Sequence, residues 1–178
     1  MTVLVRPESV ADRPAVQALI VAAFAPVEAT GRPVVEAVLN DELRLDPDFI
    51  PELTLVAELA GEIVGQVTSS YGTLIGPAGE RRMVGVGPVS VLPAQQGAGV
   101  GSTLMRAVID AADRAGEPAL VLLGSPDFYG RFGFVAAADF RIEAPDPAWG
   151  KYFQVRRLTA FDPAMAGNYR YSAPFQKL

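Results

Sequence analysis

The sequence contains neither cysteine nor histidine among its 178 residues. Without cysteine the chain can form no disulfide, no thiolate metal site and no thiol nucleophile. Without histidine it lacks the usual base of a serine triad and the commonest transition-metal ligand in proteins. An enzyme of this composition must therefore work with carboxylates, tyrosine, serine, lysine, arginine, backbone groups or water.

Long hydrophobic runs and clusters of basic charge are also lacking. No apolar run approaches the roughly 20 residues that cross a bilayer, and the N-terminal MTVLVRPES has no basic segment followed by a long apolar one. The formal net charge is −5, whereas a dedicated nucleic-acid binder needs a clustered positive surface. We therefore expect a cytoplasmic protein that binds neither nucleic acid nor membrane.

What the sequence does contain is typical of a globular α/β protein. Half of the residues are hydrophobic and a fifth are charged. No linker, internal repeat or low-complexity tract interrupts the chain, so we expect a single domain over residues 1–178. Strand-like and helix-like patterns alternate along it, which predicts a mixed α/β fold.

The hydrophobic periodicity predicts the order of the elements. Strands are expected at 2–6, 53–59, 62–71, 83–92, 119–123 and 152–159. A capping box of Ser9 and Asp12 is expected to precede a first helix that ends near residue 24. Further helices are expected at 34–43, 99–116 and 126–132, with Val34, Val35, Val38 and Leu39 of the second helix facing inward. Residues 76–82 are expected to be a loop, and the tail from residue 161 shows no clear periodicity.

The stretch VSVLPAQQGAGVGS, residues 89–102, lies between a predicted strand and the long predicted helix. A Walker loop is excluded because Gly101 is followed by serine where a lysine is required, and the dinucleotide fingerprint requires a glycine at Ser102. Gln96 and Gly99, together with Gly101, instead fit the pattern Gln/Arg-x-x-Gly-x-Gly. Such a segment can bind an anion with free amides at a helix N-terminus. A tight turn without a ligand is the alternative interpretation.

This stretch resembles the acetyl-CoA-binding motif of the GNAT N-acetyltransferase superfamily. The resemblance covers nearly the whole chain, including FYGRFGF at residues 128–134, which resembles the Tyr-x-x-x-Gly-Phe element that follows the acyl-CoA strand. Residues 46–58, DPDFIPELTLVAE, resemble a bacterial subgroup of predicted acetyltransferases. The implied fold is the GNAT acyl-CoA N-acyltransferase fold, a central mixed twisted sheet with helices on both faces.

The resemblance implies acetyl-CoA as the cosubstrate, an amine as the acceptor and no metal. The residues implied to bind the cosubstrate are Val89, Val91, Gln96, Gly97, Ala98, Gly99, Val100, Gly101, Ser102, Ser125, Tyr129 and Arg131. Amides of the glycine segment would hold the pyrophosphate, with glycine at 99 or 101 giving clearance. The backbone of Val89 and Val91 would hold the pantetheine arm and the acetyl carbonyl.

The resemblance also implies catalytic roles. Tyr129 matches the family tyrosine that protonates the departing thiolate, although it could equally pack as ordinary core. Some family members place a glutamate on the strand before the glycine segment, but residues 83–92 contain no carboxylate. Ser90, by positioning a water, and Glu28, from the loop after the first helix, are the candidates that remain. An amine that is already neutral would need no base.

The predicted function is transfer of an acetyl group from acetyl-CoA to a primary amine of a small molecule or peptide, directly in a ternary complex. Acceptor specificity is expected to come from residues 24–32, 73–82 and 139–153. A non-catalytic acyl-CoA-binding module on the same fold is the main alternative, and a nucleotide-binding enzyme is a third hypothesis. The sequence does not determine the acceptor or whether the protein is a homodimer.

Overall fold

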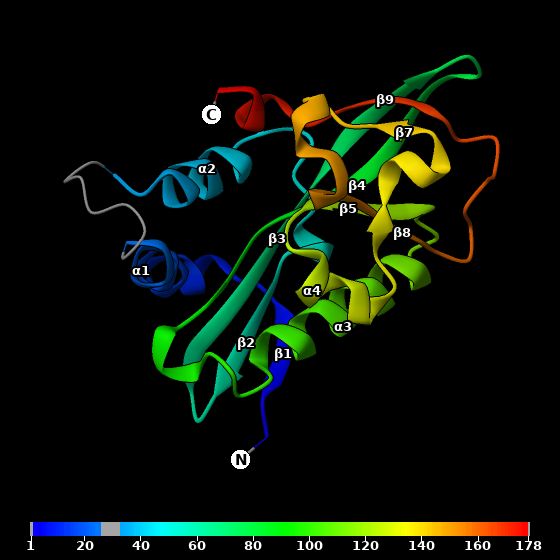
Figure 1. Ribbon diagram of the computed structural model, residues 1–178. Helices are drawn as coiled ribbons and strands as arrows, with labels where there is room; N and C mark the ends of the chain where they lie inside the picture. Colours follow the sequence, from blue (N-terminus) through cyan, green and yellow to red (C-terminus); the bar gives the residue numbers. More distant parts are fainter. Residues whose placement is uncertain (1, 26–32, 178) are drawn as a thin grey trace.

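The structure is a computed structural model that describes residues 2–25 and 33–177, and within these residues the strands form one mixed sheet with helices on both faces (Figure 1). The α-helices are α1 (Arg13–Phe24), α2 (Val35–Leu43), α3 (Val100–Arg114) and α4 (Pro126–Tyr129). The strands are β1 (Leu4–Pro7), β2 (Leu55–Leu59), β3 (Glu62–Gly76), β4 (Gly79–Val91), β5 (Ala119–Leu123), β6 (Val135–Ala136), β7 (Ile142–Glu143), β8 (Phe153–Arg157) and β9 (Gly167–Arg170).

The strands follow the order β1-β2-β3-β4-β5-β8-β6, and β9 pairs with both β3 and β7. Most neighbours are antiparallel, whereas β4 and β5 run parallel, as do β7 and β9. The parallel β4–β5 pair is reached through the crossover helix α3, which is the usual way to connect parallel strands. No helix among the described residues is long and apolar enough to span a membrane.

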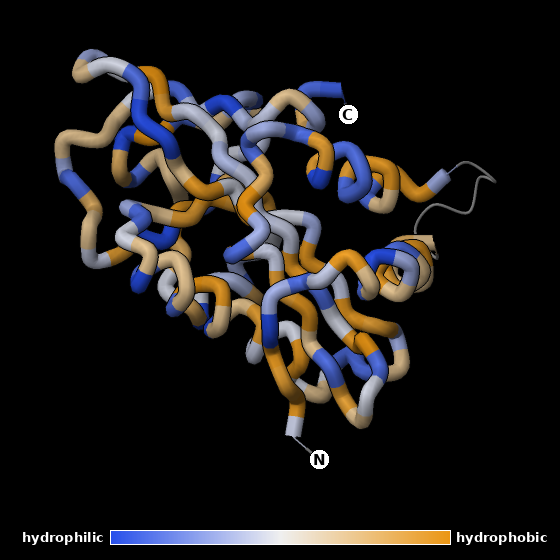
Figure 2. Tube along the Cα trace, turned by 180° about the vertical axis from the view of Figure 1, so that it is seen from behind, coloured by the Kyte–Doolittle hydropathy of each residue, from blue (hydrophilic) through white to orange (hydrophobic). Residues whose placement is uncertain are grey.

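Helices α1 and α3 cover opposite faces of the sheet (Figure 1). Helix α3 buries an apolar stripe at the 3.6-residue spacing, formed by Val100, Leu104, Met105, Val108 and Ala112. It lies close to β3 because Gly65 has no side chain, and an added Cβ there would be 2.8 Å from Val100 Cγ1. Figure 2 shows that hydrophobic stretches run along the central strands between these layers.

Strands β4 and β5 separate next to the residues that were predicted to bind the cosubstrate. Their parallel ladder consists of two pairs, Val84 with Leu120 and Gly85 with Val121. Just beyond, the register between β3 and β4 shifts, so that β4 carries one extra residue around Gly87, whose φ is +148°. A β-bulge of this kind bends the strand that contains it. The last residues of β4 therefore face a gap rather than a neighbouring strand.

Most of the predicted elements are present at the predicted places. The capping box forms, with the Ser9 amide donating to Asp12 Oδ2 at 2.7 Å. Helix α3 ends next to Gly116, which has the left-handed φ of +78° that such a C-terminal cap requires. Strand β5 is buried from Ala119 to Leu122, as its continuous apolar run predicted.

Two predictions were wrong, and one strand was not predicted. The segment 76–82 is mostly strand, because β3 and β4 continue as a long hairpin up to Gly76 opposite Gly79. Its exposed residues lack the alternation that marks a half-buried strand. The tail contributes β9, which pairs with this hairpin. On α2, Val35 and Val38 are 43% and 45% exposed, because the inner face instead carries the buried polar residue Asn40.

Candidate active site

A cavity of about 460 Å³ brings the glycine segment, the end of β4 and the FYGRFGF segment together. Its lining residues are Val89, Ser90, Val91, Gln95, Gln96, Gly97, Gly99, Val100, Gly101, Ser102, Phe128, Tyr129 and Arg131. We call it the CoA cavity. It collects most of the residues predicted to bind the cosubstrate, and it adds Gln95 and Phe128, which the sequence did not single out.

Two predicted binding residues lie outside the lining of this cavity. Ala98 is part of the turn before α3, where its amide donates to Gln95 O at 3.3 Å. Ser125 caps α4, and its carbonyl accepts from the amides of Phe128 and Tyr129 at 3.1 and 3.0 Å. Both residues therefore shape the backbone around the cavity.

The gap beside β4 exposes backbone hydrogen-bonding groups toward the CoA cavity. The Leu92 amide donates to Val64 O at 2.9 Å, so Leu92 faces β3. Successive residues of a strand point their polar groups in opposite directions, and Val89 and Val91 therefore face the open side. Among the described residues, the Val91 carbonyl accepts from Gln96 Nε2 at 3.2 Å. The Val89 groups and the Val91 amide remain available to a ligand.

Backbone conformation favours glycine at two positions of the glycine segment. Gly97 and Gly99 have φ of +79° and +87°, and an added Cβ at either would meet no described atom within 4 Å. Gly101 lies within α3, where a Cβ would be 3.4 Å from Phe128 Cζ. The left-handed backbone of Gly99 also favours glycine there, and the predicted clearance for a pyrophosphate at 99 or 101 stays a prediction. The segment ends at the N-terminus of α3, which carries free amides and partial positive charge.

Tyr129 ends helix α4 and lines the CoA cavity. Its ring packs edge-on against Phe128 and Phe134, with centroids 4.9 and 5.9 Å away. Burial raises the pKa of the Tyr129 phenol above its ordinary value. In the described part of the chain its hydroxyl has no hydrogen-bond partner. The hydroxyl is therefore a neutral, uncommitted proton donor at neutral pH.

Gly124 allows the ring of Tyr129 to lie where it does. A Cβ added at Gly124 would be 2.3 Å from Tyr129 Cε2, which is closer than real contacts permit. The Gly124 backbone is held on both sides, by its amide donating to Tyr152 O at 2.9 Å and by its carbonyl accepting from Gln154 Nε2 at 2.8 Å. The sequence analysis did not identify this residue, although a glycine directly after a buried strand is a known sign of close approach.

The Ser90 hydroxyl oxygen accepts a hydrogen bond from another side chain, so the hydroxyl proton is left to donate elsewhere. Gln66 Nε2 donates to Ser90 Oγ at 3.0 Å and to Pro88 O at 3.1 Å, and both side chains are buried. The Gln66 carbonyl in turn accepts from Thr68 Oγ1 at 3.0 Å. The Ser90 hydroxyl can therefore donate to a group in the CoA cavity, which suits it to be a donor rather than a base.

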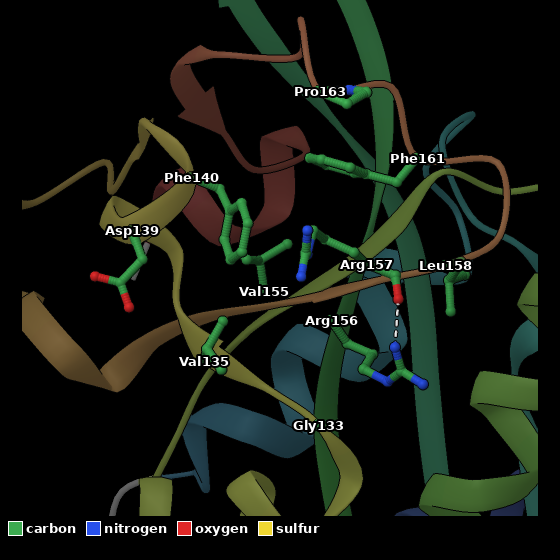
Figure 3. A pocket seen from close by; sticks show the side chains of 10 residues that line it. All are labelled: Gly133, Val135, Asp139, Phe140, Val155, Arg156, Arg157, Leu158, Phe161 and Pro163. Atoms are coloured by element: carbon green, nitrogen blue, oxygen red, sulfur yellow. Dashed lines mark hydrogen bonds between the residues drawn. The ribbon is translucent and has the colours of Figure 1, made fainter.

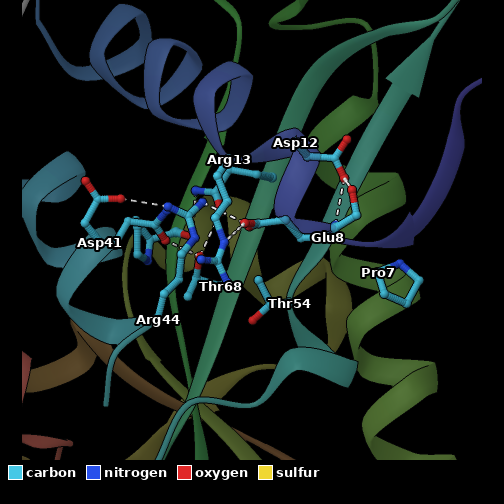
Figure 4. A network of polar contacts seen from close by, with 12 residues as sticks. Pro7, Glu8, Asp12, Arg13, Asp41, Arg44, Thr54 and Thr68 are labelled. Carbon is cyan, nitrogen blue, oxygen red and sulfur yellow. Dashed lines mark hydrogen bonds and ion pairs between the residues drawn. The ribbon is translucent and has the colours of Figure 1, made fainter.

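A buried polar chain continues from Thr68 to the surface. With its amide nitrogen toward Thr68 Oγ1 at 2.5 Å, Asn40 presents its oxygen to Arg44 Nη2 at 2.9 Å. Arg44 also pairs with Glu8 at 2.8 Å, and Figure 4 shows these charged groups beside Thr68. Every donor in this series of hydrogen bonds points toward Ser90, and the series begins at the Arg44 guanidinium. Aligned hydrogen bonds of this kind polarise one another.

A second cavity of about 420 Å³ adjoins the CoA cavity. Its lining residues are Phe24, Glu36, Leu39, Val86, Gly87, Pro88, Val89, Leu123, Tyr129, Trp149, Tyr171 and Phe175. Val89 and Tyr129 line both cavities. We call the second one the acceptor cavity, because Phe24 and Trp149 in its lining belong to segments that the sequence predicts to select the acceptor.

The acceptor cavity contains Glu36, a carboxylate that the sequence analysis missed. Glu36 lies in the first turn of α2, where an acidic residue is ordinary because it favours the helix dipole, so no sequence signal marked it out. The predicted base Glu28 lies outside the described residues. Among the described residues, no group of three or more potential ligands could hold a metal ion.

A third cavity, of about 460 Å³, lies on β8 and shares no lining residue with the other two. Figure 3 shows the Arg157 guanidinium between two rings; its Cζ is 3.9 Å from the Phe140 centroid and 5.8 Å from that of Phe161. The neighbouring Arg156 donates to backbone carbonyls of Phe132 and Arg157 at 2.9 and 2.5 Å. These arginines are engaged in packing the sheet edge.

This arrangement divides the segments that were expected to select the acceptor. From residues 139–153, Trp149 lines the acceptor cavity, whereas Phe140 packs on Arg157 and Phe153 is buried in the core. The hairpin at 73–82 lies outside the lining of the acceptor cavity. Of residues 24–32, Phe24 lines it and the others lie mostly outside the described residues.

The comparisons with known proteins agree with this geometry. The chain matches the model of the acetyltransferase (GNAT) domain over residues 5–137. It is 31% identical over 164 residues to the Escherichia coli K12 protein named uncharacterized N-acetyltransferase YhbS, covering 92% of this chain and 91% of that one. The crystal structure of E. coli YhbS in complex with CoA matches with a TM-score of 0.85 and 30% identity, covering 98% of this chain and 92% of that one. A GNAT family acetyltransferase from Brucella melitensis in complex with acetyl-CoA has a TM-score of 0.77 and 32% identity, with 98% of each chain covered.

The split sheet and its glycine segment thus define an acyltransferase. The chain belongs to the GNAT acetyltransferase family. The resemblance drawn from residues 89–102 and 128–134 is confirmed, and so is the predicted mixed α/β fold with helices on both faces of the sheet.

Proposed function

We propose that the protein transfers the acetyl group of acetyl-CoA directly to a primary amine while both are bound. The observation that carries this proposal is that Val89 and Tyr129 line both the CoA cavity and the acceptor cavity. The structures of its relatives with CoA and acetyl-CoA support the choice of cosubstrate. A ternary complex is also consistent with a chain that has no cysteine to carry the acyl group.

Acetyl-CoA supplies a thioester, and the residues of this chain orient it and accept or give protons. In this proposal the backbone amide of Val91 and the hydroxyl of Ser90, which both line the CoA cavity, donate to the carbonyl oxygen as negative charge develops on it. The amine nitrogen bonds to the carbonyl carbon and the carbon–sulfur bond breaks. Its electron pair goes to sulfur, which takes the hydroxyl proton of Tyr129, and the nitrogen gives its extra proton to water or a carboxylate in the acceptor cavity.

The protonation state of Tyr129 suits this role. Because burial raises its pKa, the phenol stays protonated through neutral and mildly alkaline pH. A CoA-like thiol has a pKa of about 8.5 in water, and desolvation in the site raises the proton affinity of its thiolate as well. Both effects favour a phenol that holds its proton until sulfur leaves.

The experiment is a CoA-release assay with thiol detection over a panel of amines, with the acetylated product confirmed by mass spectrometry. The panel contains amino acids, polyamines, aminoglycosides, peptide N-termini and simple apolar amines. We expect amine-dependent CoA release, and a loss of about 100-fold in kcat for Tyr129→Phe with unchanged CoA affinity, since general acid catalysis contributes at least about that factor. Tyr152→Phe is the matched control, because Tyr152 is 49% exposed and lines neither cavity.

Two outcomes would contradict the proposal. Calorimetric binding of CoA without turnover of any amine would favour the non-catalytic acyl-CoA-binding module. Wild-type turnover by Tyr129→Phe would remove the acid role from this residue and leave its ring as packing.

A further inference from the structure

The lining of the acceptor cavity is mostly aromatic and aliphatic. Phe24, Leu39, Trp149 and Phe175 are among its residues. Tyr171 packs against Trp149 and Phe175 with ring centroids 6.3 and 4.6 Å away. The volume of about 420 Å³ lies in the range of pockets that take small ligands. The wall therefore suits a ligand with a compact apolar body.

Glu36 is the charged side chain among the lining residues, which include no lysine or arginine in the described part of the chain. Its Oε2 is buried and has no hydrogen-bond partner there. A carboxylate oxygen that is shielded from solvent and has no hydrogen-bond partner costs free energy. A ligand that brings a positive charge next to Glu36 removes this cost.

The same lining disfavours anionic ligands. A carboxylate or phosphate on the ligand would lie close to Glu36 in a cavity whose described lining residues include no cationic side chain, so repulsion and desolvation would both oppose its binding. A polyamine is also disfavoured, because the one carboxylate among the described lining residues leaves its other ammonium groups against aromatic walls or in need of solvent. The lining thus discriminates on the number and sign of the charges.

Resting on the acetyltransferase function proposed above, we propose that the acceptor is a small apolar primary amine with one positive charge and no anionic group, held by Glu36. The amine enters as an ammonium that pairs with the Glu36 carboxylate, and this carboxylate takes one of its protons before the nitrogen attacks the thioester. The apolar body lies against Trp149, Tyr171 and Phe175. Glu36 selects the acceptor by charge, and the aromatic wall selects it by its apolar surface.

The test compares amines that differ in one feature at a time, at saturating acetyl-CoA and with the full-length protein. 2-Phenylethylamine is the probe, phenylalanine adds a carboxylate to the same skeleton, and spermidine adds charges without an apolar ring. We expect kcat/KM for 2-phenylethylamine to exceed that for each of the other two by roughly 30-fold or more, the scale on which unpaired buried charges discriminate.

The variant Glu36→Gln keeps the shape of the side chain and removes its charge. It should raise KM for 2-phenylethylamine by roughly 30-fold, while KM for acetyl-CoA and the melting temperature stay close to those of the wild type. Glu80→Gln, at an exposed position of the long hairpin that lines neither cavity, is the matched control. When both substrates are measured with both proteins, Glu36→Gln should lower the ratio of kcat/KM for 2-phenylethylamine to kcat/KM for phenylalanine.

The outcomes separate this inference from the proposed function. Turnover that favours phenylalanine or spermidine would overturn the inference while leaving the acetyltransferase function in place, and so would a Glu36→Gln variant with unchanged KM for 2-phenylethylamine. If no amine of any class is acetylated, the proposed function itself fails.

Discussion

The side-chain amide of Gln66 donates to Ser90 Oγ across 3.0 Å, which leaves the Ser90 proton free to donate toward the CoA cavity. We predict that Ser90→Ala lowers kcat by about 100-fold, the lower end of what loss of one such donor costs. The KM for acetyl-CoA should change little, because the donation strengthens as charge develops on the carbonyl oxygen. Steady-state kinetics with a good acceptor measure both parameters.

The control for Ser90→Ala is Ser70→Ala. Ser70 is also a buried serine of the sheet, but its hydroxyl lies 3.2 Å from that of Ser172 and outside both cavities. It should lower the melting temperature slightly and leave kcat unchanged. An Ser90→Ala variant with wild-type kcat would show that the Ser90 hydroxyl has no part in the reaction.

Gly99→Ala should weaken CoA binding by more than its effect on stability explains. The residue has φ of +87°, so alanine there costs roughly 1–2 kcal/mol in the free energy of unfolding. Gly116, with φ of +78°, is a matched control far from the cavities, and Gly116→Ala should cost about the same. Only Gly99→Ala should raise the Kd for CoA in calorimetry, by about 10-fold or more, through lost charged hydrogen bonds.

Gly124→Ala should displace the ring of Tyr129 and reduce kcat more than it reduces CoA affinity. The added methyl would come within 2.3 Å of the ring, so the phenol must move. Gly130→Ala adds the same methyl at the residue that follows Tyr129 in the sequence. No described atom lies within 4 Å of that methyl, so kcat should be unchanged. Equal kinetics for the two variants would show that the position of Tyr129 is not critical.

Stability should fall in alkaline solution from about pH 10 upward, the pKa of tyrosine in an unfolded chain. Burial and a hydrogen bond to Glu117 raise the pKa of Tyr71 to about 12, and burial also raises the pKa of Tyr169 and of Tyr171. As pH rises past 10, the unfolded chain loses these protons first, so the free energy of unfolding decreases toward the folded-state pKa values. Below pH 10 these tyrosines contribute no pH dependence.

Urea unfolding at intervals between pH 9 and pH 11.5 measures this effect. Tyr71→Phe should flatten part of the decline, because it removes one of the groups that ionise. A free energy of unfolding that stays constant over this interval would contradict the burial of the three hydroxyls.

The elements that could be predicted are those whose hydrophobic pattern lies within their own consecutive residues. Helix α3 has an unbroken apolar stripe, and β5 is a short apolar run between breakers. The outer half of the β3–β4 hairpin gave no such signal, because Glu80 and its neighbours are exposed. Strand β9 forms because Tyr169 is buried across from Leu74, nearly 100 positions earlier in the chain, and no local pattern encodes that pairing.

The candidate site divides in the same way. The glycine segment and Tyr129 are contiguous motifs, so the sequence was enough to single them out. Glu36 and Gln66 matter only through what lies opposite them in space, namely the acceptor cavity and Ser90. Asn40 on α2 carries no sequence signal of its own, yet it links Thr68 to Arg44 inside the protein.

The early separation of β4 from β5 gives this protein a sheet edge in its interior. Edges at the surface invite other chains to pair with them, but Val89 and Val91 line a cavity, and they present their backbone groups to it. A slender ligand with amides of its own can pair there as a short substitute strand. Substrate binding would then complete the sheet, and these two amides should gain protection from hydrogen exchange when CoA is bound.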